Sequence, residues 1–129
     1  MTAFDSIDQR FRLSQHNFNQ FADLSGDHNP IHVDPEYSAS TRFGATVSHG
    51  MLLFTILRGT LHRRFPDYRL AEQRLMFPSP AYAGEPLTLH LERNGDGSTM
   101  VFSALIVKDD GNVCLEGQCI LEPSTGNAR

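Results

Sequence analysis

The chain has 129 residues, of which 40% are hydrophobic and 20% are charged. This length suits one domain with a buried core, and the composition is ordinary for a globular protein. The formal net charge of −4 argues against a nucleic-acid-binding surface. The longest uncharged apolar run, about residues 45–57, is too short to cross a bilayer, and the N-terminus lacks the basic and apolar regions of a signal peptide. We therefore expect a cytoplasmic protein that binds neither nucleic acid nor membrane.

The N-terminal part of the chain predicts two short helices with a loop between them. After a lead-in, residues 10–13 alternate between apolar and polar and predict a short strand. Residues 14–24 predict an amphipathic helix that is capped at its first residue by a serine hydroxyl. A loop is expected over residues 27–32, and a second short helix over residues 35–41, which starts with a proline after an aspartate cap.

The rest of the chain predicts one long helix followed by strands. The helix is expected from Ser48, as its N-cap, to about Arg64, and its apolar residues cover most of its circumference, so it should be buried in the core. Strands are expected over residues 69–77, 87–93, 100–108 and 113–122, with turn signals at 95–97 and 109–112. A long buried helix and a run of antiparallel strands are typical of an α+β fold. The whole chain, 1–129, is expected to form this single domain.

Two cysteines, Cys114 and Cys119, are expected to stay unpaired. Their odd spacing along a predicted strand places them on opposite faces, so they should not form a disulfide. Free thiols agree with a reducing cytoplasm. The sequence has no zinc-type spacing of cysteines, and we expect no metal site.

Residues 26–32 hold the most informative chemical pattern, Gly-Asp-His-Asn-Pro-Ile-His. Gly26 permits a bend, and Pro30 fixes its own φ and keeps the preceding residue out of the helical region. A loop of this kind can hold the carboxylate of Asp27 and the imidazole of His32 facing one small space. Such a pair can transfer a proton between water and a substrate carbon. The alternative is that Asp27 caps a turn and His32 is a core histidine.

This stretch resembles the hydratase motif of the MaoC-like family, the (R)-specific 2-enoyl-CoA hydratases of hot-dog fold. The motif runs aromatic, aliphatic, small, Gly-Asp-x-Asn-Pro, aliphatic, His, then Ala or Ser. The matching residues are Phe21, Leu24, Ser25, 26–30, Ile31, His32 and Ser38. Residues 48–53 also resemble the family, at the start of its central helix, and the resemblance covers about residues 9–122. It implies an antiparallel sheet wrapped around that helix, and a homodimer.

The resemblance also implies a hydro-lyase. Asp27 and His32 would add water to a 2-enoyl thioester, or dehydrate an (R)-3-hydroxyacyl thioester, carried by CoA or an acyl carrier protein. The backbone N–H of Gly50 would bind the thioester carbonyl, since N–H groups in a first helical turn lack partners; the alternative is a packing glycine. Asn29 and His49 are expected to support this site, mainly as structural residues. No cofactor is expected, because the reaction changes no oxidation state overall.

Arg58 departs from the family pattern, because many members carry a serine at this position, nine residues after the His of the His-Gly pair. A long cation there is expected to bias the substrate toward anionic or polar acyl groups, to contact the carrier arm, or to pair with an acid such as Glu72. Arginines are concentrated between residues 58 and 74. They suit phosphate binding, and the alternative is a solvated helix end.

Two other classes of function remain open from the sequence. A hot-dog acyl thioesterase would attack the thioester carbonyl carbon instead of the double bond. A non-catalytic acyl-thioester binding module would keep the fold and the Gly50 donor and would tolerate loss of Asp27 and His32. The presence of both the acid and the imidazole favours the hydro-lyase.

Overall fold

The computed structural model describes residues 6–94 and 99–124 and shows one antiparallel sheet with a long helix against it. The strands are β1 (Ser6–Phe11), β2 (Tyr68–Met76), β3 (Leu87–Asn94), β4 (Met100–Lys108) and β5 (Val113–Pro123), in the sheet order β1-β3-β4-β5-β2. The helices are α1 (Gln15–Ser25), α2 (Pro30–Val33), α3 (Pro35–Ala39) and α4 (Gly50–Arg64). The predicted α+β architecture, a sheet wrapped around a long central helix, is confirmed.

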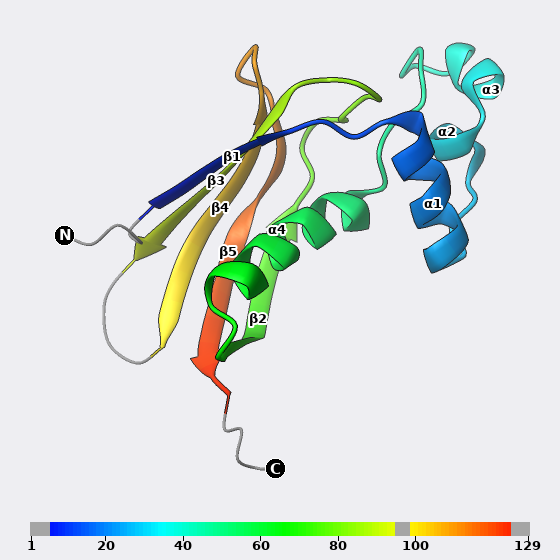
Figure 1. Cartoon of the computed structure of the whole chain (residues 1–129). Helices are drawn as coiled ribbons and strands as arrows, with labels where there is room; N and C mark the ends of the chain where they lie inside the picture. Colours follow the sequence, from blue (N-terminus) through cyan, green and yellow to red (C-terminus); the bar gives the residue numbers. More distant parts are fainter. Residues whose placement is uncertain (1–5, 95–98, 125–129) are drawn as a thin grey trace.

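The sheet curves around α4, and the shorter helices α1, α2 and α3 lie beyond one end of α4 (Figure 1). In β3 the side chains of Leu87, Leu89 and Leu91 are buried, and the residues between them are not. This alternation directs one face of each central strand toward the helix. From the helix side, Leu53, Leu57 and Leu61 of α4 enter the same core.

Strand boundaries were predicted well in the C-terminal half and less well at the N-terminus. β4 occupies residues 100–108, as predicted, and the turn after it holds Gly111 at φ 91°, with its N–H bonded to the Lys108 carbonyl. The turn predicted at 95–97 lies outside the described residues. The first strand covers Ser6–Phe11 rather than 10–13, because its pairing with β3, from Ser6 with Glu92 onward, decides where it begins.

The start of α4 and its burial differ from prediction. His49 is the N-cap residue, without a side-chain cap, and the Ser48 hydroxyl instead bonds the His49 carbonyl. The helix is not buried all round: Met51 is 52% exposed, and Thr55 and Arg58 are exposed on the same side. The sheet covers only one side of α4, so an apolar circumference did not imply full burial.

The short helices begin at the expected caps. Ser14 accepts a hydrogen bond from the Asn17 N–H at the start of α1, and Gly26 ends that helix with φ 82°. The Asp34 side chain caps α3 through two backbone N–H groups. This helix ends at Ala39, two residues before the predicted end, and a turn follows it.

Both cysteines are free and buried in the described structure. Burial raises the pKa of Cys114 and of Cys119 to about 11. Neither thiol is therefore ionised near neutral pH, and the prediction that they do not pair is confirmed. Within residues 6–94 and 99–124, no helix has the length and apolar character that crossing a membrane requires.

Candidate active site

His32 lies on α2, and not in an open loop as the sequence predicted. Pro30 provides the first helical residue, and the Asn29 side chain accepts a hydrogen bond from the Ile31 N–H as the N-cap. Asn29 therefore has the structural role expected of it. The His32 ring is buried, and its Nδ1 lies 2.8 Å from the Val47 carbonyl oxygen. Because a carbonyl only accepts, Nδ1 carries the hydrogen, which leaves the Nε2 lone pair of the neutral ring free to act as a base.

The Asp27 carboxylate uses its two oxygens differently. Oδ1 accepts a hydrogen bond from the Asn29 N–H at 3.2 Å, which is the turn-capping role considered above. Oδ2 lies 3.7 Å from Nε2 of His32. Two acceptors at this separation can each take one hydrogen of a single water molecule. The side chain of Asp27 is 54% exposed, so water reaches the pair from solvent.

His49 links the two residues. Its ring stacks on His32, with centroids 3.8 Å apart and planes 22° apart, and Phe21 contacts it edge-on at 4.9 Å. Its Nε2 lies 3.0 Å from the Asp27 carbonyl oxygen and must donate to it. Burial lowers the pKa of His49, so the ring stays neutral at neutral pH, and its buried Nδ1 has no hydrogen-bond partner among the described residues.

Asp27, His32 and His49 bring possible metal ligands within 4.8 Å of one another. A ring nitrogen binds a metal along its lone pair, which lies in the ring plane, at about 2.0–2.1 Å for zinc. The His32 and His49 rings are stacked with centroids 3.8 Å apart and planes only 22° apart, so a single ion at bonding distance cannot lie in both ring planes. The donor set fits acid–base chemistry better than metal binding, and the metal-free site stays a prediction.

Gly50 is the first residue of α4, and no hydrogen bond to its N–H is found among the described residues. A Cβ built on Gly50 would lie 3.1 Å from two carbons of the Phe77 ring, which is tight. The packing role considered from the sequence is therefore present. This packing contact does not involve the backbone N–H of Gly50. The N–H can therefore also donate a hydrogen bond to a ligand oxygen, with the support of the helix dipole.

A cavity of about 420 Å³ connects His32 with the start of α4. Its walls also come from the segment after α3 and from the loop after β2, and they include Ile31, Arg42, Phe43, Val47, Ser48, Leu53, Phe77, Pro78, Ser79, Pro80, Ala81 and Cys114. His32 and Gly50 both line it, whereas Asp27 does not and reaches the site through its carboxylate, 3.7 Å from Nε2 of His32.

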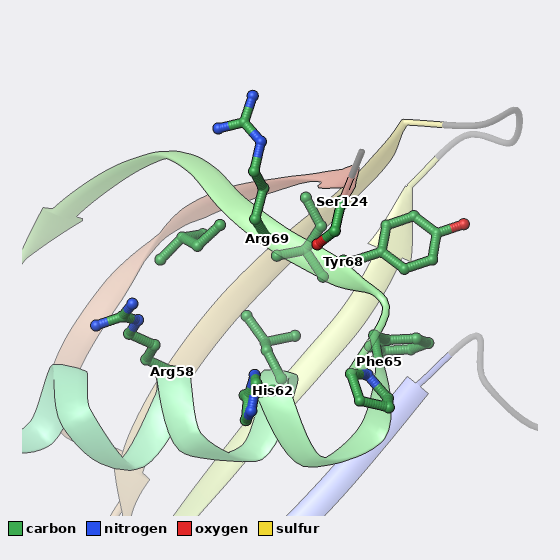
Figure 2. A pocket seen from close by; sticks show the side chains of 10 residues that line it. Arg58, His62, Phe65, Tyr68, Arg69 and Ser124 are labelled. Atoms are coloured by element: carbon green, nitrogen blue, oxygen red, sulfur yellow. The ribbon is translucent and has the colours of Figure 1, made fainter. Parts of the chain in front are cut away.

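Arg58 does not line this cavity. It borders two other hollows, one of about 310 Å³ at the C-terminal end of α4 (Figure 2) and one of about 520 Å³ on the exposed side of that helix, next to Phe21 and Met51. Glu72, the acid considered as its partner, lies 3.7 Å from Arg74. No ion pair to Arg58 is found within residues 6–94 and 99–124.

The structure adds residues to the site that the sequence did not reveal. The Val47 carbonyl sets the tautomer of His32, and Phe77 and Arg42 line the cavity. Phe77 was assigned to the end of a strand, whereas it follows β2 at the start of a proline-containing loop. Only its proximity to Pro78 signalled an irregular segment.

Comparison with known proteins gives consistent matches over most of the chain. The family described as "MaoC like domain" matches residues 5–112. The (R)-specific enoyl-CoA hydratase of Aeromonas caviae is 29% identical over 125 residues, which cover 90% of this chain and 93% of that protein. The 3-hydroxyacyl-thioester dehydratase Z of Mycobacterium tuberculosis is 29% identical over 123 residues, which cover 85% and 79%. The solved structure of the (R)-hydratase from A. caviae aligns with a TM-score of 0.86 at 27% identity, covering 92% of this chain and 93% of that one.

Proposed function

Because this chain belongs to the MaoC-like domain family, we propose that it is a hydro-lyase that adds water to a 2-enoyl thioester or, in reverse, dehydrates an (R)-3-hydroxyacyl thioester. The observation that carries the proposal is the pair of acceptors formed by Asp27 Oδ2 and His32 Nε2, which lie 3.7 Å apart beside the cavity. The names of the relatives in A. caviae and M. tuberculosis support the reaction class and, for the former, the (R) configuration.

Binding of the thioester carbonyl prepares the substrate. The Gly50 N–H donates a hydrogen bond to the carbonyl oxygen, and the positive end of the α4 dipole adds to this field. Electron density moves toward that oxygen, which makes the β-carbon of the enoyl group electrophilic. The same hydrogen bond stabilises the negative charge that develops on the oxygen when the β-carbon is attacked.

Asp27 and His32 then handle the protons. A water molecule donates one hydrogen bond to each of them. One residue removes a proton from the water as the water oxygen bonds to the β-carbon. This proton passes to the other residue, which delivers it to the α-carbon, so the product gains one water in total and the site returns to its starting state. Both act from one side of the double bond, which gives syn addition, and dehydration follows the same steps in reverse.

The reaction needs no redox cofactor, because the added water changes no oxidation state overall. In the proposed mechanism Asp27 and His32 supply the proton transfers and the Gly50 N–H polarises the carbonyl, so no step requires a metal. The proposed substrate carriers are CoA and acyl carrier protein, and the two free cysteines are consistent with a reducing cytoplasm as the location.

One assay separates this function from its alternatives. The protein is incubated with crotonyl-CoA while the enoyl absorbance and free thiol are followed together. Loss of absorbance without release of thiol is the expected result. Release of thiol identifies a thioesterase and contradicts the proposal. If neither change occurs, the assay is repeated over a panel of enoyl chain lengths, and binding without either change across the whole panel identifies a binding module and also contradicts the proposal.

We propose further that the protein is a homodimer. β2 is the last strand of the sheet and has one unpaired side, and an unpaired strand edge favours pairing with another chain. Met51, Met76 and Phe77 expose 52%, 60% and 43% of their surface, which adds apolar area near β2 and α4 that a second copy would cover. Sedimentation at micromolar concentration should give twice the chain mass, and a monomer would contradict the proposal.

A further inference from the structure

Among the residues that the structure describes, Arg42 is the one with a permanent charge that lines the active-site cavity. The other lining residues are apolar or neutral, apart from the titratable His32, and none is an aspartate or glutamate. The buried part of the wall is formed by His32, Val47, Leu53, Ala81 and Cys114, whereas Arg42 and Phe77 are exposed. The cavity therefore extends from an apolar interior to a mouth with a single positive charge.

The backbone that carries Arg42 is held firmly, although the side chain is exposed. The Gly44 N–H bonds the Thr41 carbonyl at 3.1 Å, and Gly44 adopts φ 75°, which closes a tight turn with Arg42 at its corner. The Tyr82 hydroxyl donates to the Phe43 carbonyl at 2.9 Å. The guanidinium group itself lies 4.9 Å from the centre of the Phe43 ring, a cation–π distance.

No acid neutralises this guanidinium group within the described part of the chain. Other cations do have acidic partners: Arg10 pairs with Asp109 at 2.7 Å, and Lys108 lies 3.4 Å from Glu85. The contact with the Phe43 ring is a cation–π contact, and no hydrogen bond from the guanidinium N–H groups is found among the described residues, so these groups are available to an anion. Arginine is suited to this task because its planar fork can bind two oxygens of a phosphate or carboxylate.

The hollow at the end of α4 is a weaker candidate for an anion site, although it also contains arginines. Figure 2 shows Arg58 on the helix and Arg69 on β2, with guanidinium groups that point away from His62 and in different directions. Arg69 is already paired with Glu122 at 2.7 Å. These two side chains do not converge on one ligand.

We propose that Arg42 forms an anion-binding subsite at the mouth of the active-site cavity. Its ligand is an anionic group of the thioester substrate, either a phosphate of the carrier arm or a carboxylate at the far end of the acyl group. The identity of that ligand as a thioester rests on the proposed function. With the carbonyl at Gly50, the arm that leaves toward solvent passes the exposed Arg42, so the carrier phosphate is the expected ligand.

Calorimetric titration with three unreactive, saturated ligands tests the subsite independently of turnover. Butanoyl-pantetheine is uncharged, butanoyl-4′-phosphopantetheine adds the arm phosphate, and succinyl-pantetheine adds an acyl carboxylate. The wild-type protein should bind the phosphate ligand at least about tenfold more tightly than the uncharged one, the scale of one charge-assisted hydrogen bond. Arg42→Gln should lose this preference and keep its affinity for butanoyl-pantetheine. Arg63→Gln, which removes an exposed arginine outside all three hollows, should keep it.

The outcomes are distinct. If Arg42→Gln weakens only succinyl-pantetheine, the anion is the acyl carboxylate, which still assigns the subsite to Arg42. If the wild-type protein binds all three ligands with equal affinity, or if Arg42→Gln retains the full wild-type preference, the inference is wrong. The crotonyl-CoA assay tests the hydro-lyase proposal separately. The hydro-lyase proposal and the inference about Arg42 can therefore be rejected independently of each other.

Discussion

His49 donates a hydrogen bond from Nε2 to the Asp27 carbonyl oxygen at 3.0 Å, and so fixes the backbone that carries the acid. Its ring also stacks on His32, so one side chain determines the relative position of both members of the proposed acid–base pair. It lies 22 positions after Asp27 in the sequence, and only the fold brings the two together.

We therefore predict that His49 acts as a positioning residue. His49→Ala should lower kcat about tenfold or more, because the acid and the base lose a shared support, with a smaller effect on KM. His49→Gln can still donate from its amide and should recover part of the loss. Equal kcat values for both variants and the wild-type protein would contradict this role.

Stability should fall as the solution becomes acidic, partly because of His49. Burial lowers its pKa in the folded protein, so the unfolded chain binds more protons once the pH drops below about 6.5. The contribution of His49 to the free energy of unfolding is complete above that pH, and it is lost as the pH falls toward the pKa of His49 in the folded protein. Exposed His28 has a raised pKa beside Asp23 and acts in the opposite direction. Urea unfolding at pH 7.5 and pH 5.5, at one protein concentration, measures this effect. The free energy of unfolding should fall less between the two pH values in His49→Gln than in the wild-type protein.

Replacing Gly50 tests whether packing and carbonyl binding are separable at this residue. Gly50→Ala places a Cβ 3.1 Å from the Phe77 ring and should cost about 1–3 kcal/mol of stability. Adding Phe77→Ala should restore stability by removing the clash. If the Gly50 N–H binds the carbonyl, kcat/KM stays low in the double variant compared with Phe77→Ala alone, because the methyl group still obstructs the ligand. Full recovery of kcat/KM would indicate a packing glycine only.

Arg58 should influence which acyl groups are accepted. It lines the hollows on either side of α4 and lacks an ion pair in the described structure, so a substrate that extends along the helix would meet its charge. Arg58→Ser is expected to improve kcat/KM several-fold for longer plain aliphatic enoyl-CoAs and to leave kcat/KM for the short crotonyl-CoA unchanged. A panel of chain lengths provides the measurement. An unchanged profile with altered stability alone would show that Arg58 has no role in specificity.

The sequence predicted the elements whose signals are local. A largely apolar run between two turn signals located β4 to the residue, and the caps at Ser14 and Asp34 located α1 and α3. The Asp27 and His32 pair was found because both lie on one short, recognisable segment. The first strand was misplaced because its extent depends on pairing with β3, about 80 residues away in the chain.

Features that depend on tertiary packing escaped prediction. The exposed side of α4 at Met51 could not be predicted, because apolar residues around a helix do not say which side the sheet covers. The link from His49 to Asp27 and the contact of Phe77 with Gly50 join segments whose proximity only the fold determines. No local pattern in the sequence marks Arg42 as a binding residue, because the cavity beside it is formed by segments that only the fold brings together.

The most direct test of the acid–base pair is the hydration rate of crotonyl-CoA by Asp27→Asn and by His32→Gln, each with its folded state checked by circular dichroism. Each substitution keeps the approximate shape of the side chain and removes its ability to take a proton. We expect kcat to fall about a hundredfold or more in both variants, the scale of general acid–base catalysis. A folded variant of either kind that hydrates crotonyl-CoA at nearly the wild-type kcat would contradict the proposed roles of Asp27 and His32.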